Sequence, residues 1–442
     1  MEAMADASPP PPAAPATRGG YGLGHERFTL LFAVMLVAAA GNTAMQSLLP
    51  SIGRALEVAD LWVAVAFSLS AILWVVMAPH WARRADQRGR RALMRLGLAG
   101  FVASMLVCGV VLAAGLAGWL GGMAVFLVFT LGRGLYGLWG SASPPAVQAY
   151  IAARTEGAQR TGALAALASS FGLGTIIGPA LAPIFIFAPL GLAAPLIVFA
   201  GIGLVVLALI VLRLPDDTPR NPAHGRIIDY PMIGTTGGAR QPETEESPGK
   251  LKWRDPRVWP WVLTGMIGGH GQAILLSVVG FLVIDRLGLS AAEAQHDIAV
   301  VLIGGAVASL LAQWWLIPQL GLSPMQLVVW GSVLAAAGSV LTGVTANLYA
   351  MTLSFALASL GFGFFRPGFT SGASLAVTLD EQNGVAGIVT SANGIPYLVG
   401  PAVGVAIYGL GWSLPFTLTG LLMLALAAWA AVSLRPSRPP AA

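Results

Sequence analysis

The chain has 442 residues, of which 56% are hydrophobic and only 10% are charged, and its mean hydropathy is +0.76. A soluble protein of this length would carry roughly 25% charged residues, so the composition excludes an ordinary soluble domain. The pI of 9.7 would suggest nucleic acid as the partner of a soluble protein. In this chain membrane topology explains it, and we expect no nucleic-acid partner.

Apolar runs of about 20 residues recur along the chain, and each can cross roughly 30 Å of hydrocarbon. Because lipid offers no partners to backbone N–H and C=O groups, we predict an all-α integral membrane protein in the lipid bilayer. The one cysteine, Cys108, excludes an intramolecular disulfide. The twelve predicted spans are about 28–50, 60–81, 92–114, 119–141, 161–187, 191–214, 257–284, 297–318, 326–345, 347–368, 384–410 and 412–434.

Polar segments divide the chain into two halves. Residues 1–27 are predicted to be a disordered tail, because they are rich in Pro and Ala and lack the pattern of a signal peptide. The stretch 215–256 is the only long polar insert, and it is the predicted linker between six-span bundles at 28–214 and 257–434. Residues 435–442 form a short tail.

The two halves repeat one another at a shift of 222 residues. Gly178 and Pro179 reappear as Gly400 and Pro401. The same shift pairs Pro145 with Pro367, Gly162 with Gly384, Ser169 with Ser391, Gly172 with Gly394 and Ala180 with Ala402. A duplicated membrane bundle places a substrate site between its halves near the midplane, so the repeat predicts a transporter.

The basic residues predict the orientation. If both termini are cytoplasmic, twenty of the 24 Lys and Arg residues fall on the cytoplasmic side. Arg54 and Arg286 fall outside, whereas Arg133 and Arg366 lie within or at the ends of spans, where Arg366 is expected to be an anchor. This bias predicts a multi-pass protein of the bacterial inner membrane with both termini and the linker in the cytoplasm.

The first span carries Asn42 and Gln46 four residues apart on one helix face. Polar side chains at this depth face protein or a water-filled cavity. Substrate contact and interhelical hydrogen bonding both remain open for this pair.

The segment after the second span is predicted to be a loop and reads WARRADQRGRRALM, from Trp81 to Met94. It resembles the major facilitator superfamily signature Gly-x-x-x-Asp-Arg-x-Gly-Arg-Arg/Lys, although residues 82 and 87 are Ala and Gln where the family has Gly and Arg. The matching residues are Asp86, Gly89, Arg90 and Arg91.

The resemblance covers about residues 28–434 and implies twelve helices in two pseudo-symmetric six-helix bundles. It also implies a conformational latch, in which Asp86 pairs with an Arg across a sliding interface and Gly89 permits a tight turn. A basic loop that merely obeys the topology rule is the alternative.

The fourth span contains Arg133 flanked by Gly132 and Gly134, and a charge inside a membrane helix is a functional candidate by default. The segment resembles the drug-antiporter motif Arg-x-x-Gln-Gly-x-x-x-Gly, with Tyr136 in place of Gln. In the family this Arg is implicated in proton coupling. The alternative is an Arg that only pairs with a backbone carbonyl and holds the bundle together.

The fifth span carries Gly174, Gly178 and Pro179, and it resembles the antiporter motif Gly-x-x-x-Gly-Pro-x-x-Gly-Gly, which marks exporters. Ala182 and Pro183 replace the last two glycines. Glycines four residues apart permit close helix packing, and Pro introduces a kink. Ordinary small-residue packing is the alternative interpretation.

The seventh span holds His270 and Gln272, and the resemblance implies that spans one and seven line the central cavity. His270 has a side chain that titrates near physiological pH, although a satisfied core histidine is the alternative. Gln313 and Asn393 are weaker cavity candidates.

No Asp or Glu is predicted at a span centre, whereas many family members carry a proton-exchanging carboxylate in span one. We therefore predict a proton route through His270, Asp285 or Asp86. The sequence has no phosphate-binding Gly-x-x-x-x-Gly-Lys-Ser/Thr motif and no visible metal cluster, so no cofactor is expected.

The predicted function is secondary active export of a small, lipophilic or drug-like molecule by proton antiport and alternating access, without enzymatic chemistry. A monomer is expected. An uptake symporter or facilitator for a sugar, organic acid or siderophore is the alternative, and a polytopic membrane enzyme is a remote one.

Overall fold

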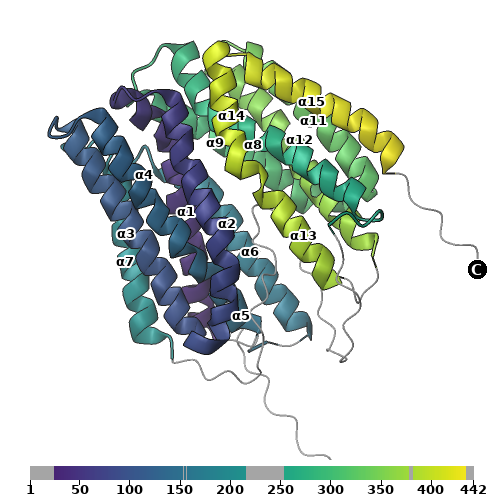
Figure 1. Cartoon of the computed structure of the whole chain (residues 1–442), viewed down its shortest axis with the longest axis horizontal. Helices are drawn as coiled ribbons and strands as arrows, with labels where there is room; N and C mark the ends of the chain where they lie inside the picture. Colours follow the sequence, from purple (N-terminus) through teal and green to yellow (C-terminus); the bar gives the residue numbers. More distant parts are fainter. Residues whose placement is uncertain (1–23, 153, 156, 216–252, 378–381, 435–442) are drawn as a thin grey trace, which may run out of the picture.

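The computed structural model describes residues 24–152, 154–155, 157–215, 253–377 and 382–434. Within these ranges the chain is built of helices and contains no strand beyond one isolated bridge. The N-terminal half, drawn on the left of Figure 1, comprises α1 (His25–Ala55), α2 (Asp60–Arg88), α3 (Arg90–Leu116), α4 (Gly122–Leu138), the 3₁₀ turn η2 (Gly140–Ala142), α5 (Ser143–Ala152), α6 (Gly157–Leu181) and α7 (Ala194–Arg213).

The C-terminal half lies on the right of Figure 1. It comprises α8 (Trp259–Leu287), α9 (Ala294–Leu311), the π-helix η3 (Ala312–Leu316), α10 (Ile317–Leu320), α11 (Pro324–Val344), α12 (Leu348–Leu375), α13 (Gln382–Gly394), α14 (Pro396–Leu410) and α15 (Leu414–Ser433).

The helices account for the twelve predicted spans. Eleven segments of the described chain are long and apolar enough to cross a membrane. The fifth span is α6, whose described apolar part is Gly172–Leu181. The predicted all-helical membrane fold is therefore confirmed.

Three spans consist of more than one helix. The fourth joins α4 to α5 through η2, and α5 begins with Ser143, Pro144 and Pro145. Proline lacks an N–H, so it fits the first turn of a new helix better than the interior of a continuous one. The eighth span passes through η3 before Pro318, and the eleventh restarts at Pro396. These interruptions were not predicted.

The segment from Trp81 to Met94 is not the loop that the sequence predicted. Helix α2 continues to Arg88, α3 begins at Arg90, and Gly89 alone separates them. Arginine favours helices, so α2 extends beyond its apolar part. Gly89 has a φ of 81°, a left-handed conformation that suits glycine, so the predicted tight turn is present.

The repeat in the sequence corresponds to a repeat in packing. Helix α6 packs against α1, and α14 packs against α8. Gly178 faces the backbone of α1 at Ala40, and Gly400 faces Ala273 of α8. In each half a glycine therefore allows the corresponding pair of helices to approach closely.

Candidate functional site

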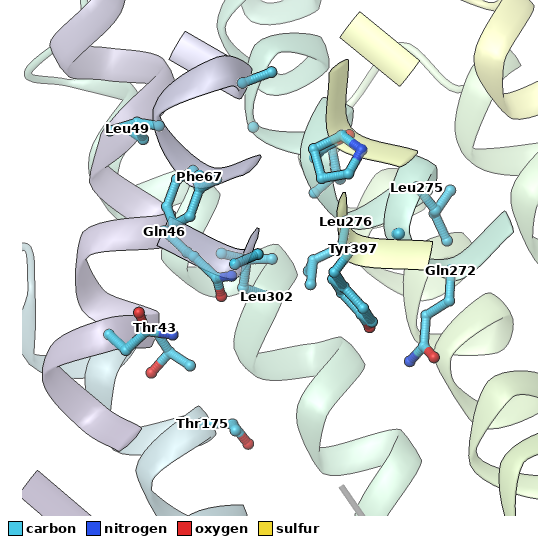
Figure 2. Close-up of a pocket in the computed structure, with 18 of the residues that line it drawn as sticks. Thr43, Gln46, Leu49, Phe67, Thr175, Gln272, Leu275, Leu276, Leu302 and Tyr397 are labelled. Carbon is cyan, nitrogen blue, oxygen red and sulfur yellow. The ribbon is translucent and has the colours of Figure 1, made fainter. Parts of the chain in front are cut away.

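A cavity of about 300 Å³ lies between the two halves. Its described wall comes from α1, α2, α4 and α6 on one side, and from α8, α9, α12, α13 and α14 on the other. Figure 2 shows Gln46 and Phe67 of the N-terminal half across the cavity from Leu276 and Tyr397 of the C-terminal half. Most of the described lining residues are apolar, and the others carry hydroxyl, amide, indole or guanidinium groups.

Several residues singled out from the sequence line this cavity. They are Asn42, Gln46, Arg133, Tyr136, Pro179, Gln272 and Pro401. His270, Gln313 and Asn393 are not part of the described wall. His270 Nδ1 lies 2.7 Å from the carbonyl oxygen of Met266, and Gln313 Nε2 donates to Ser309 Oγ at 3.2 Å. The functional roles of all these residues remain predictions.

Arg133 is only 3% exposed and borders the cavity from α4. Its Nη2 donates to Asn42 Oδ1 at 2.9 Å, which links α4 to α1. The guanidinium carbon lies 5.3 Å from the ring centre of Phe67 and 5.1 Å from that of Tyr136. Within the described part of the chain, Nε and Nη1 have no hydrogen-bond partner. The positive charge of Arg133 is thus stabilised by the side-chain amide of Asn42 and by the ring faces of Phe67 and Tyr136.

A second guanidinium reaches the cavity from the opposite half. Arg366 on α12 is 5% exposed, and its Nε donates to Asn393 Oδ1 at 2.9 Å. The sequence predicted an anchor at the end of the tenth span. That position is wrong, because α12 continues to Leu375 and Arg366 lies well inside it. Asn393 therefore contacts the cavity-lining Arg366 without lining the described cavity itself.

Sequence reasoning missed most of the aromatic wall. Phe67, Trp74 and Tyr397 line the cavity, as does Thr175. Aromatic residues in an apolar helix give no polar signal that would single them out. The repeat gives a signal for Tyr397, because Tyr397 lies 222 residues after Thr175 and both residues belong to the duplicated segment.

A cluster that joins the halves packs on Phe281, which lines the cavity, and is here called the Arg54 cluster (Arg54, Asp60, Asp285 and Tyr408). Arg54 Nη2 lies 2.8 Å from Asp60 Oδ2 and 3.0 Å from Asp285 Oδ2. Tyr408 Oη donates to the same Asp285 oxygen at 2.7 Å. These charge-assisted bonds tie α1 and α2 to α8 and α14.

Two further contacts join the halves beside the Arg54 cluster. Gln295 Nε2 of α9 donates to Ser47 Oγ of α1 at 3.1 Å. Gly280 of α8 faces Pro50 of α1, at 2.6 Å from where a Cβ would lie. The halves are therefore packed together beside the Arg54 cluster.

The predicted latch lies at the opposite end of α2. The side chain of Asp86 is outside the described residues. Arg90 is buried, and Arg91 Nη2 donates to the carbonyl of Val211 in the same half. A latch between the halves at this position remains a prediction. No group of three or more His, Cys, Asp or Glu in the described chain is placed to hold a metal.

The sequence matches the family model described as "Major Facilitator Superfamily" over residues 30–324. The chain belongs to this superfamily. The resemblance inferred from the 81–94 segment is therefore confirmed, and the chain is a transporter with a small-molecule substrate.

Within the superfamily, two curated relatives come from Bacillus subtilis (strain 168). Multidrug resistance protein 1 is 24% identical over 395 residues, which cover 88% of this chain and 91% of the relative. Multidrug resistance protein 2 is 24% identical over 403 residues, which cover 90% and 92%.

Solved structures share the fold. A bacterial homolog of the human lysosomal transporter Spinster, in an inward-facing and occupied conformation, aligns with a TM-score of 0.71 at 13% identity and covers 94% of this chain and 99% of its own. A POT family transporter in complex with 5-aminolevulinic acid aligns with a TM-score of 0.67 at 14% identity, covering 92% and 96%.

Proposed function

We propose that this superfamily member exports small lipophilic or drug-like molecules across the bacterial inner membrane. The observation that carries the proposal is the mostly apolar, aromatic wall of a cavity that both halves share. Such a wall favours ligands with a large apolar body and few polar groups. The names of the two Bacillus subtilis relatives support the same class of substrate.

The resemblance of Gly174, Gly178 and Pro179 to the antiporter motif that marks exporters supports export over uptake. Gly174 and Gly178 face Ala39, Ala40 and Thr43 of α1, as expected for the exporter-type motif that this segment resembles. Uptake of a sugar, organic acid or siderophore is the competing function.

Alternating access would move the two six-helix bundles, 28–214 and 257–434, about the cavity. With both termini and the 215–256 linker cytoplasmic, the Arg54 cluster lies on the periplasmic side. The described contacts between the halves would then lie on the periplasmic side of the cavity. We take the monomer as the transporting unit.

We expect cells that overproduce the protein to tolerate more of some lipophilic compounds in a chemical panel, and a deletion strain to tolerate less. Export lowers the intracellular amount of such a compound, so accumulation of a compound found in the screen should fall in the overproducing strain. Higher accumulation in overproducing cells would contradict export and favour uptake.

Proton antiport is the proposed energy source, and Asp285 is the proposed proton carrier. Its carboxylate accepts from Arg54 and Tyr408, and protonation would weaken this tie between the halves. In the state open to the periplasm Asp285 would take up a proton, and re-formation of its contacts with Arg54 and Tyr408 would release that proton toward the cytoplasm as the cavity turns inward, so that each cycle moves one proton into the cell. No carboxylate lines the described cavity wall, and His270 and Asp86 are the alternative carriers.

In liposomes that contain the purified protein, an imposed pH gradient should accelerate transport by the wild type. Asp285→Asn should remove this dependence on the pH gradient, because the amide side chain of Asn cannot take up and release a proton as a carboxylate does. Glu293→Gln, at an exposed position immediately before α9, is the control and should respond like the wild type. If Asp285→Asn keeps the full response, the carrier is another residue; if the wild type ignores the gradient, proton antiport is wrong.

A further inference from the structure

The cavity wall carries positive charge from both halves. Arg133 borders it from α4 and Arg366 from α12. No Asp, Glu or His occurs among the residues that line it in the described part of the chain. The formal charge of this described wall is therefore positive.

The sequence shows that α3 and α4 offer Arg133 no acidic partner. No Asp or Glu occurs anywhere between residues 87 and 155. The carboxylates of Asp60 and Asp285 contact Arg54, which partly neutralises them. Phe67 and Tyr136 contact the Arg133 guanidinium through their ring faces, which hold the cation without cancelling its charge.

Charges in a cavity with a low-dielectric wall act over several ångströms, so a ligand senses them without touching them. A cationic ligand would be repelled, and an anionic ligand attracted, before any direct contact forms. Arg133 has further capacity, because five N–H groups belong to a guanidinium and Nε and Nη1 have no partner in the described chain. A turn of this side chain toward the cavity would present two donors to one carboxylate.

We infer that the exported substrate is an amphipathic organic anion, whose apolar body packs on Phe67, Trp74 and Tyr397 and whose carboxylate or similar group lies near Arg133 and Arg366. The inference rests on the proposed function for the direction of transport, but the preference for negative charge concerns binding alone. It excludes lipophilic cations as the preferred substrates.

Three probes that share the dansyl fluorophore and differ in charge test the inference. They are dansylglycine, which is an anion, its neutral amide, and the cation dansylcadaverine. Fluorescence titration of the purified full chain should give a dansylglycine Kd at least about tenfold below that of the amide, equivalent to about 1.4 kcal/mol. Dansylcadaverine should bind more weakly than the amide.

Arg133→Gln should reduce the preference for dansylglycine to less than about threefold, because the Gln side chain has no charge and cannot donate two hydrogen bonds to a carboxylate as a guanidinium does. Arg366→Gln should act in the same direction from the other half. If either variant fails to fold, the comparison of the three probes on the wild type decides alone. Equal binding of dansylglycine and its amide, or tighter binding of dansylcadaverine, would overturn the inference.

Inside-out membrane vesicles separate this inference from the proposed function. Anion-selective binding without transport into the vesicles would contradict the proposed export and support the preference for negative charge. Transport of dansylcadaverine with no transport of dansylglycine would leave export standing and overturn the anion preference.

Discussion

Replacement of Arg133 by Ala is expected to reduce export on the order of 100-fold. Arg133 is the charged group that α4 contributes to the described cavity wall, and its Nη2 donates to Asn42 Oδ1 at 2.9 Å. Loss of a charge-assisted contact between Arg133 and the substrate costs roughly 3 kcal/mol at the upper end, so the export rate should fall on the order of 100-fold. Arg133→Lys should retain little, because a point ammonium cannot contact Asn42 and a substrate as the planar guanidinium does.

The measurement is the initial rate of export, normalised to the amount of monodisperse protein in the membrane. This normalisation matters because Asn42 loses its donor in the Ala variant, which costs about 1–3 kcal/mol of stability if the amide stays buried. Arg95→Ala is the matched control, since it removes an exposed arginine from α3. If Arg133→Ala exports at the wild-type rate, Arg133 only stabilises the helix bundle.

The fold was predictable because the bilayer imposes a simple rule on the sequence. Every span must hide its backbone polar groups in a helix, so apolar length alone identifies the elements. Helix ends are less constrained, because a helix can continue into water on charged residues. Helix α2 therefore extends to Arg88 and α12 to Leu375, beyond the predicted ends. The error at α12 is the reason that Arg366 was assigned to a helix end.

The sequence identifies several polar residues that line the cavity but not most of the aromatic ones. Asn42, Gln46 and Arg133 were found because polar groups are rare at that depth. Which face of a helix meets the cavity depends on how neighbouring helices pack, and one sequence does not contain that rotation. His270 was therefore selected with Gln272, although only Gln272 lines the described cavity.

Addition of a single methyl group at Gly178 is expected to destabilise the protein strongly. A Cβ at this position would overlap Thr43 Oγ1 and the carbonyl oxygen of Ala40, and it would lie 2.8 Å from the backbone nitrogen of Ala44. Two of these three atoms belong to the backbone of α1, so they cannot rotate away. The contact also includes the hydrogen bond from Thr43 Oγ1 to the Gly174 carbonyl at 3.0 Å.

Gly178→Ala should therefore force α6 away from α1 and cost about 1–3 kcal/mol, the range for an overpacked core. Gly172→Ala is the matched control on the same helix, because its Cβ would lie 3.5 Å from Leu310 Cδ2, an ordinary contact. Alanine favours a helix over glycine by roughly 0.5–1 kcal/mol, so this control should be neutral or slightly stabilising. Thermal unfolding of both purified variants in the same detergent gives the comparison. Equal Tm values would show that α1 and α6 do not depend on the close approach at Gly178, and the exporter-type motif would then have no structural basis in this chain.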